Sequence, residues 1–160
     1  MNNLDIAKAV RGDAEMLEAF GGVLSCDHLR RLGRSLCLPS ERPLFYIVNS
    51  RPARSEGEHW LLIYLPEEGL KEFFDPLGRS PEYYSKYFKE FLERKHSQYL
   101  CSNRPVQPPG SDTCGDFCLY YAARRVRGES MLDIIESFRR DNLWFNHFMV
   151  RQYSFQLRFQ

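Results

Sequence analysis

Hydrophobic positions at helical spacing alternate along this chain with short, uninterrupted apolar runs. Helical spacing predicts one or two short helices over residues 4–20, interrupted by a Gly-Asp pair and capped at their end by Gly21 and Gly22. A further helical turn or two is expected over residues 26–32, with Asp27 as a candidate cap. The first fifth of the chain is therefore predicted to be helical.

A helix that begins with proline is predicted in the middle of the chain, over residues 80–96. Ser80 is expected to cap it and Pro81 to occupy its first position, with aromatic residues along one side. The stretch SQYLCSN that follows predicts a short strand, and residues 130–153 predict one or two more helices.

The uninterrupted apolar runs predict strands. Residues 44–48, LFYIV, have the composition of a buried strand. The runs HWLLIYL and LKEFFDPLG, separated by the turn-forming PEEG, predict a β-hairpin. In an antiparallel pair the start of one strand lies beside the end of the other. We therefore expect His59 and Asp75 to be neighbours.

Length and charge narrow the class of protein. A chain of 160 residues with 43% hydrophobic content favours one domain over residues 1–160. The net charge of +1 gives no global field toward nucleic acid or membrane, and basic clusters such as RRVR at 124–127 are interpreted as solvated faces. Five cysteines and an amphipathic, charged N-terminal segment favour free thiols in a reducing compartment, cytosol or nucleus. No stretch approaches the roughly 20 apolar residues of a membrane span.

The segment VQPPGSDTCGDFCLYY changes from a rigid loop to a helix at a thiol. Cys114 is the first member of a stripe at i, i+3, i+4 and i+7, so it faces inward at the helix N-terminus. Unpaired N–H groups and the positive end of the helix dipole favour the nucleophilic thiolate there. Cys118, one turn further, is expected to be core, as are Cys26, Cys37 and Cys101, which have no polar constellation around them.

A thiol nucleophile needs a base, a group that orients the base, and donors for the oxyanion. His59 stands at a strand edge opposite Asp75 and is the candidate base. Gln107 lies in the proline-stiffened loop before the helix, where its amide could fold back beside Cys114, whose own N–H is a second donor. The other histidines lie in or at the end of predicted helices without a matched acid: His28, His96 and His147.

These pieces, EHW, FFDPLG and QPPGSDTCGDFC, resemble the adenovirus-type maturation proteases (adenain), including those of adintoviruses and Polinton elements, which are related to SUMO-specific proteases. The likeness covers roughly residues 18–127. It implies an α+β, papain-like fold in which a central helix bearing the thiol packs on a mixed sheet. It also implies Cys114 as nucleophile, His59 as base and then acid, Asp75 as the orienting group and Gln107 as oxyanion donor.

The resemblance further implies a monomeric thiol endopeptidase that needs no cofactor for its chemistry and no membrane. Its partners would be viral structural precursors cut at Gly-containing sites, in the host nucleus or the virion. DNA and a peptide are the activators known for adenovirus enzymes; the net charge of +1 weakens the case for DNA, and Cys101 does not match the position of the cysteine that binds the peptide. Asp75 replaces the Glu of the adenovirus enzymes, as in the SUMO branch, and the C-terminal region 128–160 is short.

Two other functions stay open at this point. One is an isopeptidase for a ubiquitin-like modifier of the SUMO or NEDD8 type, which would need an extended surface for a folded partner. The other is an inactive protease fold that serves as a binding module. Such a module has no physical need for the thiol and the imidazole together, which argues against it.

Overall fold

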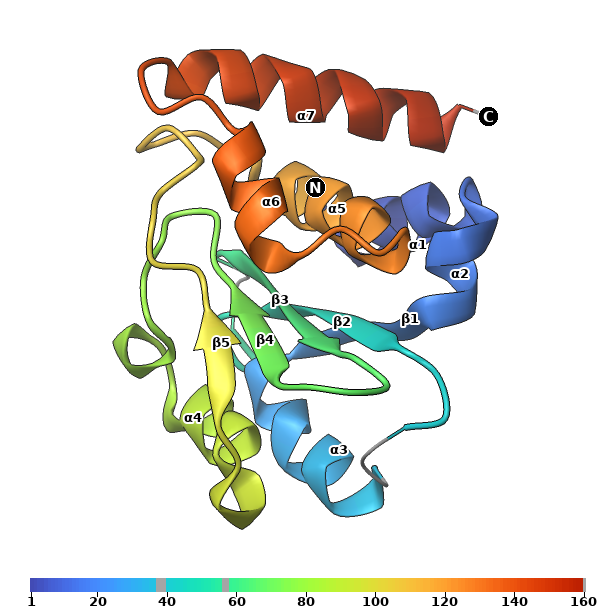
Figure 1. Ribbon diagram of the computed structural model, residues 1–160, viewed down its shortest axis with the longest axis vertical. Coiled ribbons are helices and arrows are strands. Elements are labelled where there is room, and N and C mark those ends of the chain that lie inside the picture. Colours follow the sequence, from blue (N-terminus) through green and yellow to red (C-terminus); the bar gives the residue numbers. More distant parts are fainter. Residues whose placement is uncertain (37–39, 56–57, 160) are drawn as a thin grey trace.

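The computed structural model describes residues 1–36, 40–55 and 58–159, and its centre is a mixed β-sheet (Figure 1). Five strands lie in the order of the chain: β1 (Phe20–Ser25), β2 (Leu44–Asn49), β3 (Trp60–Leu65), β4 (Lys71–Phe74) and β5 (Tyr99–Cys101). The outer pairs β1–β2 and β4–β5 are parallel, whereas β2–β3 and β3–β4 are antiparallel. The predicted mixed sheet, the buried strand near residue 44 and the hairpin are confirmed.

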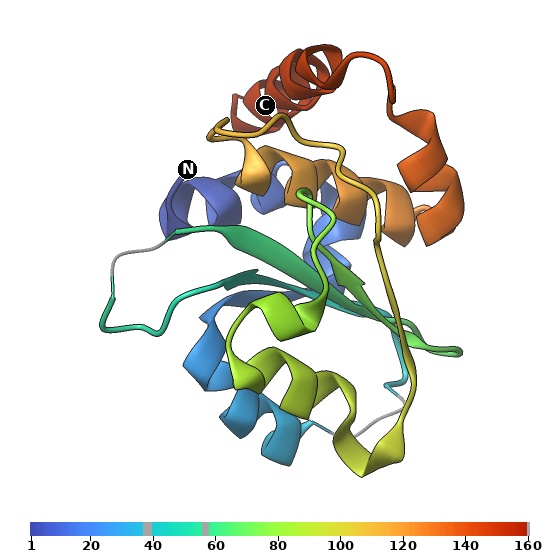
Figure 2. The same ribbon diagram turned by 90° about the vertical axis from the view of Figure 1, so that its left-hand side faces the viewer.

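Helices cover both faces of this sheet (Figure 2). On one face lie α1 (Asn3–Arg11), α2 (Ala14–Ala19), α5 (Cys114–Val126), α6 (Met131–Ser137) and α7 (Leu143–Arg158). The opposite face carries α3 (Leu29–Ser35) and α4 (Lys86–Leu92). Each face has its own cluster of buried side chains, because successive side chains of a strand point to opposite faces of the sheet. No helix in the described residues is long and apolar enough to cross a membrane.

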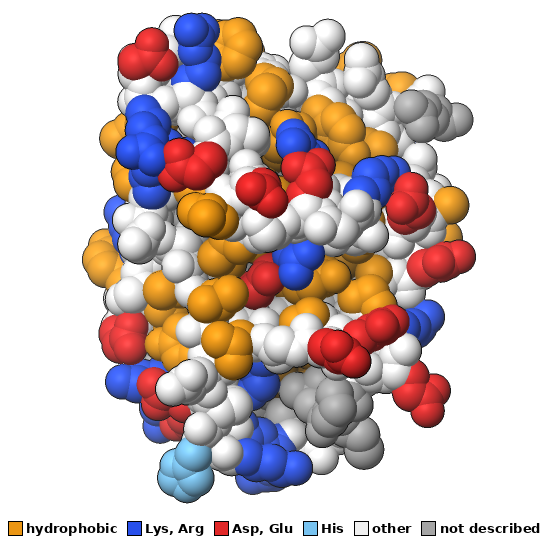
Figure 3. Space-filling model, in the orientation of Figure 1, with side chains coloured by type: hydrophobic (Ala, Val, Ile, Leu, Met, Phe, Trp, Pro, Cys, Tyr) orange, Lys and Arg blue, Asp and Glu red, His pale blue; other side chains and the backbone are white. Residues whose placement is uncertain are grey.

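The surface in Figure 3 mixes basic and acidic side chains. Three arginines of the predicted basic cluster 124–127 pair with carboxylates: Arg124 with Glu129, Arg125 with Glu72, and Arg127 with Asp13. These arginines are therefore paired with carboxylates of the same chain.

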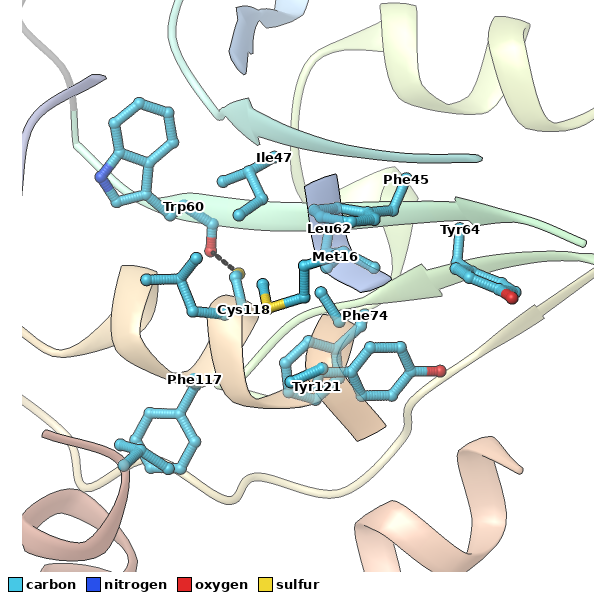
Figure 4. Close-up of a cluster of buried hydrophobic side chains, with 14 of the residues drawn as sticks. Met16, Phe45, Ile47, Trp60, Leu62, Tyr64, Phe74, Phe117, Cys118 and Tyr121 are labelled. Atoms are coloured by element: carbon cyan, nitrogen blue, oxygen red, sulfur yellow. Dashed lines mark hydrogen bonds between the residues drawn. The ribbon is translucent and has the colours of Figure 1, made fainter. Parts of the chain in front are cut away.

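Helix α5 packs on β3 through the apolar stripe predicted from its sequence (Figure 4). Tyr121 stacks on Phe74 with ring centroids 4.3 Å apart, and its hydroxyl donates to the buried Glu72 at 2.6 Å. The Cys118 thiol lies 3.6 Å from the Trp60 carbonyl oxygen. These contacts anchor α5 to β3 and β4, and so fix its first residue, Cys114, beside the start of the hairpin.

The predicted helix over residues 80–96 is wrong as a single element. The chain forms a 3-10 turn at Pro81–Tyr83, then α4, then a second 3-10 turn at Arg94–His96, and Ser80 makes no side-chain cap. Tyr84 is extended, with φ −101° and ψ −165°, and its hydroxyl donates to Asp75. A tertiary hydrogen bond to a buried carboxylate thus outweighs one turn of local helix.

Two predicted caps near the N-terminus are also wrong. Gly21 and Gly22 lie inside β1 instead of ending a helix, and a Cβ on Gly21 would stand 2.3 Å from the Tyr46 ring. The Asp27 carboxylate accepts the Ala53 N–H at 3.0 Å and so ties down the loop after β2 rather than capping α3. Cys37, predicted to be core, lies outside the described residues.

Candidate active site

The hairpin brings His59 and Asp75 together as predicted. His59 directly precedes β3 and Asp75 directly follows β4, and the register pairs Leu62 with Phe74. His59 Nε2 lies 2.7 Å from Asp75 Oδ1, and the two residues are 8% and 0% exposed. The imidazole is thus held by a buried carboxylate, with its other nitrogen available on the far side of the ring.

Asp75 is held in turn by a set of donors. The backbone N–H of Leu77 donates to Oδ1 at 2.9 Å, and that of Arg79 donates to Oδ2 at 3.0 Å. The Tyr84 hydroxyl donates to Oδ2 at 2.6 Å. The Asp75 N–H itself donates to the Ser102 hydroxyl at 3.0 Å. Both carboxylate oxygens are therefore satisfied, and the plane of the carboxylate that faces His59 is fixed.

Cys114 lies at the N-terminus of α5, 8% exposed, on the side of the helix that meets the hairpin. The Trp60 backbone N–H donates to its sulfur at 3.4 Å. Burial opposes a charge on His59, yet the hydrogen bonds to Asp75 and Cys114 and their negative charge outweigh it and raise the pKa of His59 to about 9. The site therefore favours an imidazolium beside the sulfur.

Gln107 is buried in the loop that leads to α5. The N–H groups of Val106 and Gln107 both donate to the Pro76 carbonyl, at 2.9 and 3.0 Å, which ties this loop to the chain leaving Asp75. The Gln107 amide nitrogen donates to the carbonyl and the hydroxyl of Ser111, at 2.9 and 3.0 Å. Because a carbonyl only accepts, these contacts fix which way the amide faces. Its buried Oε1 has no hydrogen-bond partner among the described residues.

A cleft of about 1060 Å³ joins three of the four predicted residues, since its walls include His59, Gln107 and Cys114. Asp75 lies behind the imidazole and outside the lining. The N-terminal residues form another wall, where the Met1 carbonyl accepts the Trp60 indole N–H at 3.1 Å. A Cβ on Gly115 would stand 2.7 Å from the Met1 sulfur, so a larger residue after the cysteine would displace the Met1 side chain.

The remaining cysteines and histidines have other surroundings. Cys26 and Cys118 are buried and Cys101 is half-buried, each as a free thiol. His28 contacts the Ser25 hydroxyl, and no described group of three or more His, Cys, Asp or Glu side chains could hold a metal ion. The sequence patterns did not indicate a role for Tyr84, which resembled one more aromatic residue on a helix, or for His147. Neither carries a signal in spacing or composition.

Several solved structures share the fold of this chain. The ASFV protease matches with a TM-score of 0.63 over 98% of this chain and 66% of its own, at 16% identity. The C-terminal Ulp1 protease domain, solved in complex with the yeast ortholog of SUMO, matches with a TM-score of 0.57 over 98% and 75%, at 14% identity. A central domain of a Legionella pneumophila protein matches with a TM-score of 0.54 over 98% of both chains, at 17% identity. The predicted α+β fold of adenain-like and SUMO-specific cysteine proteases is confirmed.

One relative found by its sequence is an adenovirus protease. The protease of porcine adenovirus A serotype 3 is 29% identical over 63% of this chain and 63% of its own length, so the chain spans less than two thirds of that relative. No protein-family model matches the chain. The predicted likeness to adenovirus-type cysteine proteases is confirmed by this relative, and the solved structures confirm the fold.

Proposed function

We propose that this protein is a cysteine endopeptidase that cuts viral or transposon precursor proteins at Gly-containing sites. The observation that carries the proposal is the buried contact of His59 with Asp75 beside the thiol of Cys114, with both His59 and Cys114 in the wall of an open cleft. Such a contact between an orienting acid, a base and a thiol is what thiol catalysis requires.

In the proposed reaction, the Cys114 sulfur attacks the peptide carbonyl carbon and His59 donates its proton to the departing amine. The Gln107 amide and the Cys114 N–H receive the negative charge that develops on the carbonyl oxygen. His59 then takes a proton from water, and the resulting hydroxide cleaves the thioester to release the acid product. Asp75 holds the imidazole in one tautomer and orientation throughout.

The choice of viral precursors is supported by the relatives. The sequence relative is an adenovirus protease, and the ASFV protease shares the fold. The host nucleus or the virion is the place that this choice implies. An open cleft that contains the thiol can accept an extended segment of a precursor in β-like conformation.

The second candidate, an isopeptidase for a SUMO-like modifier, is favoured by one observation. The Ulp1 domain, solved with such a modifier, has the same fold. The resemblance also implies that Asp75 corresponds to the acid of the SUMO-protease branch. The two functions separate in one assay: fluorogenic Gly-containing peptides and a fluorogenic SUMO fusion are compared by kcat/KM. Turnover of the fusion that far exceeds that of every peptide would replace our first choice.

Whether the site is a catalyst at all is tested with iodoacetamide at neutral pH, read by mass spectrometry. We expect Cys114 to be alkylated far faster than Cys26, Cys101 or Cys118, and His59→Ala to remove this advantage. Peptide cleavage should disappear in Cys114→Ala and persist in Cys118→Ala, the matched control one turn along the helix. Equal alkylation of all thiols, without cleavage, would favour the inactive binding module.

No cofactor enters the proposed chemistry, and activation by DNA or a peptide is a separate question. The arginines of residues 124–127 are paired with carboxylates, and the face drawn in Figure 3 carries both basic and acidic side chains. Neither feature provides a continuous basic surface for DNA. We expect double-stranded DNA to leave the rate of peptide cleavage unchanged. A rate that rises with DNA and falls back with salt would make it an activator.

A further inference from the structure

Helix α7 forms hydrogen bonds with both ends of the loop that carries Gln107. This loop, residues 106–113, begins where the N–H groups of Val106 and Gln107 donate to the Pro76 carbonyl, and it ends at the start of α5. At its first residue, the buried Asn146 side chain donates to the Val106 carbonyl at 3.1 Å. At its last residue, the Thr113 hydroxyl meets Nδ1 of the buried His147 at 3.0 Å. Two successive residues of α7 thus hold the loop as a bracket.

A chain of hydrogen bonds links His147 to Gln107. The Gln107 amide nitrogen contacts the Ser111 hydroxyl at 3.0 Å, this hydroxyl contacts that of Thr113 at 3.3 Å, and Thr113 contacts His147. An amide nitrogen only donates, so Ser111 accepts from it and is free to donate to Thr113. Thr113 can then donate to His147, and the series ends on the lone pair of Nδ1. Each hydroxyl in the chain is satisfied on both sides.

The Thr113 hydroxyl does not cap α5, although Thr113 stands at the N-cap position of that helix. Threonine at a helix N-cap normally accepts an N–H of the first turn. Here Thr113 is the N-cap of α5, yet its side chain makes no cap hydrogen bond. The hydroxyl serves the chain to Gln107 instead, while the first-turn N–H groups of α5 stay available near the sulfur.

The His147 ring is itself fixed by its neighbours on α7. It packs edge-on against Trp144 and Phe148, with centroids 5.1 and 5.0 Å away. Asn146 is fixed too, since its amide also exchanges hydrogen bonds with the backbone of Arg139. Both ends of the bracket are therefore rigid before any substrate arrives.

We propose that α7 positions the Gln107 amide, through Asn146 at one end of the loop and His147 at the other. The inference rests on the proposed role of Gln107 as oxyanion donor. An oxyanion donor is effective only when its direction is set before charge develops on the substrate. The carbonyl and the hydroxyl of Ser111 both accept from the amide nitrogen, and the chain from His147 holds that hydroxyl. To stabilise the reaction, the developing oxyanion replaces the hydroxyl of Ser111, a residue of the cleft wall, as acceptor of one amide N–H. Asn146 and His147 are positioning residues, since neither lines the cleft.

The first test reads the geometry without a substrate. In ¹⁵N-labelled protein, the side-chain amide protons of Gln107 are identified by their loss in Gln107→Ala, and their exchange with water is measured. Breaking the chain with Thr113→Val or His147→Leu, or the contact with Val106 by Asn146→Ala, should speed this exchange about tenfold. Thr113→Ser keeps the hydroxyl, and His147→Asn keeps an acceptor near the Nδ1 position, so both should stay within about twofold of wild type. Unchanged exchange in Thr113→Val would overturn the proposal.

The second test reads the consequence for catalysis on a cleaved fluorogenic peptide. Thr113→Val should lower kcat about 5- to 10-fold with KM within about twofold, and Thr113→Ser should restore kcat. In a Gln107→Ala background the same change should cost less than about twofold, because its route is already removed. An equal loss in both backgrounds would overturn the proposal. Thermal unfolding is followed alongside, with the exposed Gln152→Ala on α7 as control.

The two arms separate this inference from the proposed function. A wild-type protein that cleaves no peptide, with the predicted exchange behaviour intact, would refute the protease and support the positioning. A protein that cleaves peptides, with Gln107 exchange indifferent to Thr113 and His147, would support the protease and refute the positioning.

Discussion

Tyr84 donates a 2.6 Å hydrogen bond to the Asp75 carboxylate oxygen that His59 does not use. The Tyr84 ring also lies nearly parallel to the imidazole, with centroids 5.9 Å apart. Burial and the bond to Asp75 raise the pKa of the Tyr84 phenol, so the hydroxyl keeps its proton and remains a donor. One aromatic residue therefore supports both the acid and the base of the site.

Replacing Tyr84 with Phe should weaken the site without removing it. The change deletes one donor to a buried carboxylate that keeps two backbone donors, so we expect a loss of about 1.5–3 kcal/mol of unfolding free energy. The rate should fall less than in an Asp75 variant. Urea unfolding and peptide cleavage measure the two effects, with the neighbouring Tyr83→Phe as control because its ring is exposed. Equal effects of the two changes would argue against the Tyr84–Asp75 bond.

Asp75→Asn should preserve the fold and slow catalysis strongly. An amide in this place can still accept one hydrogen bond, but it carries no charge to hold an imidazolium. The loss of orientation in triad enzymes is on the order of 10⁴ in kcat. Kinetics on a fluorogenic peptide, with circular dichroism for the fold, provide the measurement. A wild-type rate would mean that another acid orients His59.

The activity should fall on the alkaline side of pH about 9, which is the raised pKa of His59. Above that pH the imidazolium loses the proton that it must give to the leaving amine, so kcat/KM declines. Asp75→Asn removes part of what raises this pKa, so its alkaline limb should lie at lower pH. The pH profile of kcat/KM in both proteins tests this. A wild-type limb near 6.5, the ordinary value for histidine, would contradict the prediction.

The same proton links stability to pH. The folded protein holds the His59 proton up to pH about 9, whereas the unfolded chain releases it near 6.5. Between these values the native state binds more protons, so this contribution to stability is full below 6.5 and is lost as pH rises through about 9. Urea unfolding from pH 6 to 10 should show this decline, and His59→Gln should flatten it. An identical decline in the variant would assign it to other groups.

Gln107→Ala should lower kcat by about 10² to 10³ and leave KM nearly unchanged, as expected for loss of one oxyanion donor. The amide is buried, so some loss of stability accompanies the change, and unfolding must be measured in parallel. Gln107→Glu is the matched variant, because it keeps the shape and removes the donor. A rate close to wild type in Gln107→Glu would reduce Gln107 to a loop residue.

Much of the candidate site follows from short-range sequence patterns. The spacing of the two apolar runs and the turn between them predicts the hairpin, and the hairpin alone makes His59 and Asp75 neighbours. The apolar stripe of α5 puts Cys114 on the face that meets the sheet. These features are predictable because each depends on local periodicity and on which face of an element must be buried.

The failures share a different cause. The helix predicted over residues 80–96 breaks where Tyr84 reaches Asp75, and Asp27 leaves its cap position to hold Ala53. In each case a polar side chain finds a partner that propensity does not encode. Local preference is worth roughly a few tenths of a kcal/mol per residue, while a hydrogen bond to a buried charged group, such as that of Tyr84 to Asp75, is worth about 1.5–3 kcal/mol.

The sequence by itself determined the hairpin of β3 and β4, the pairing of His59 with Asp75, and the thiol at the start of α5. Only the tertiary structure decided that Tyr84 would complete the shell of Asp75 and that His147, from the far end of the chain, would reach Thr113. Hydrophobic periodicity specifies which face of an element is buried. Which buried polar groups meet depends on the angle and distance at which remote elements dock, and those are set by the packing of the whole core.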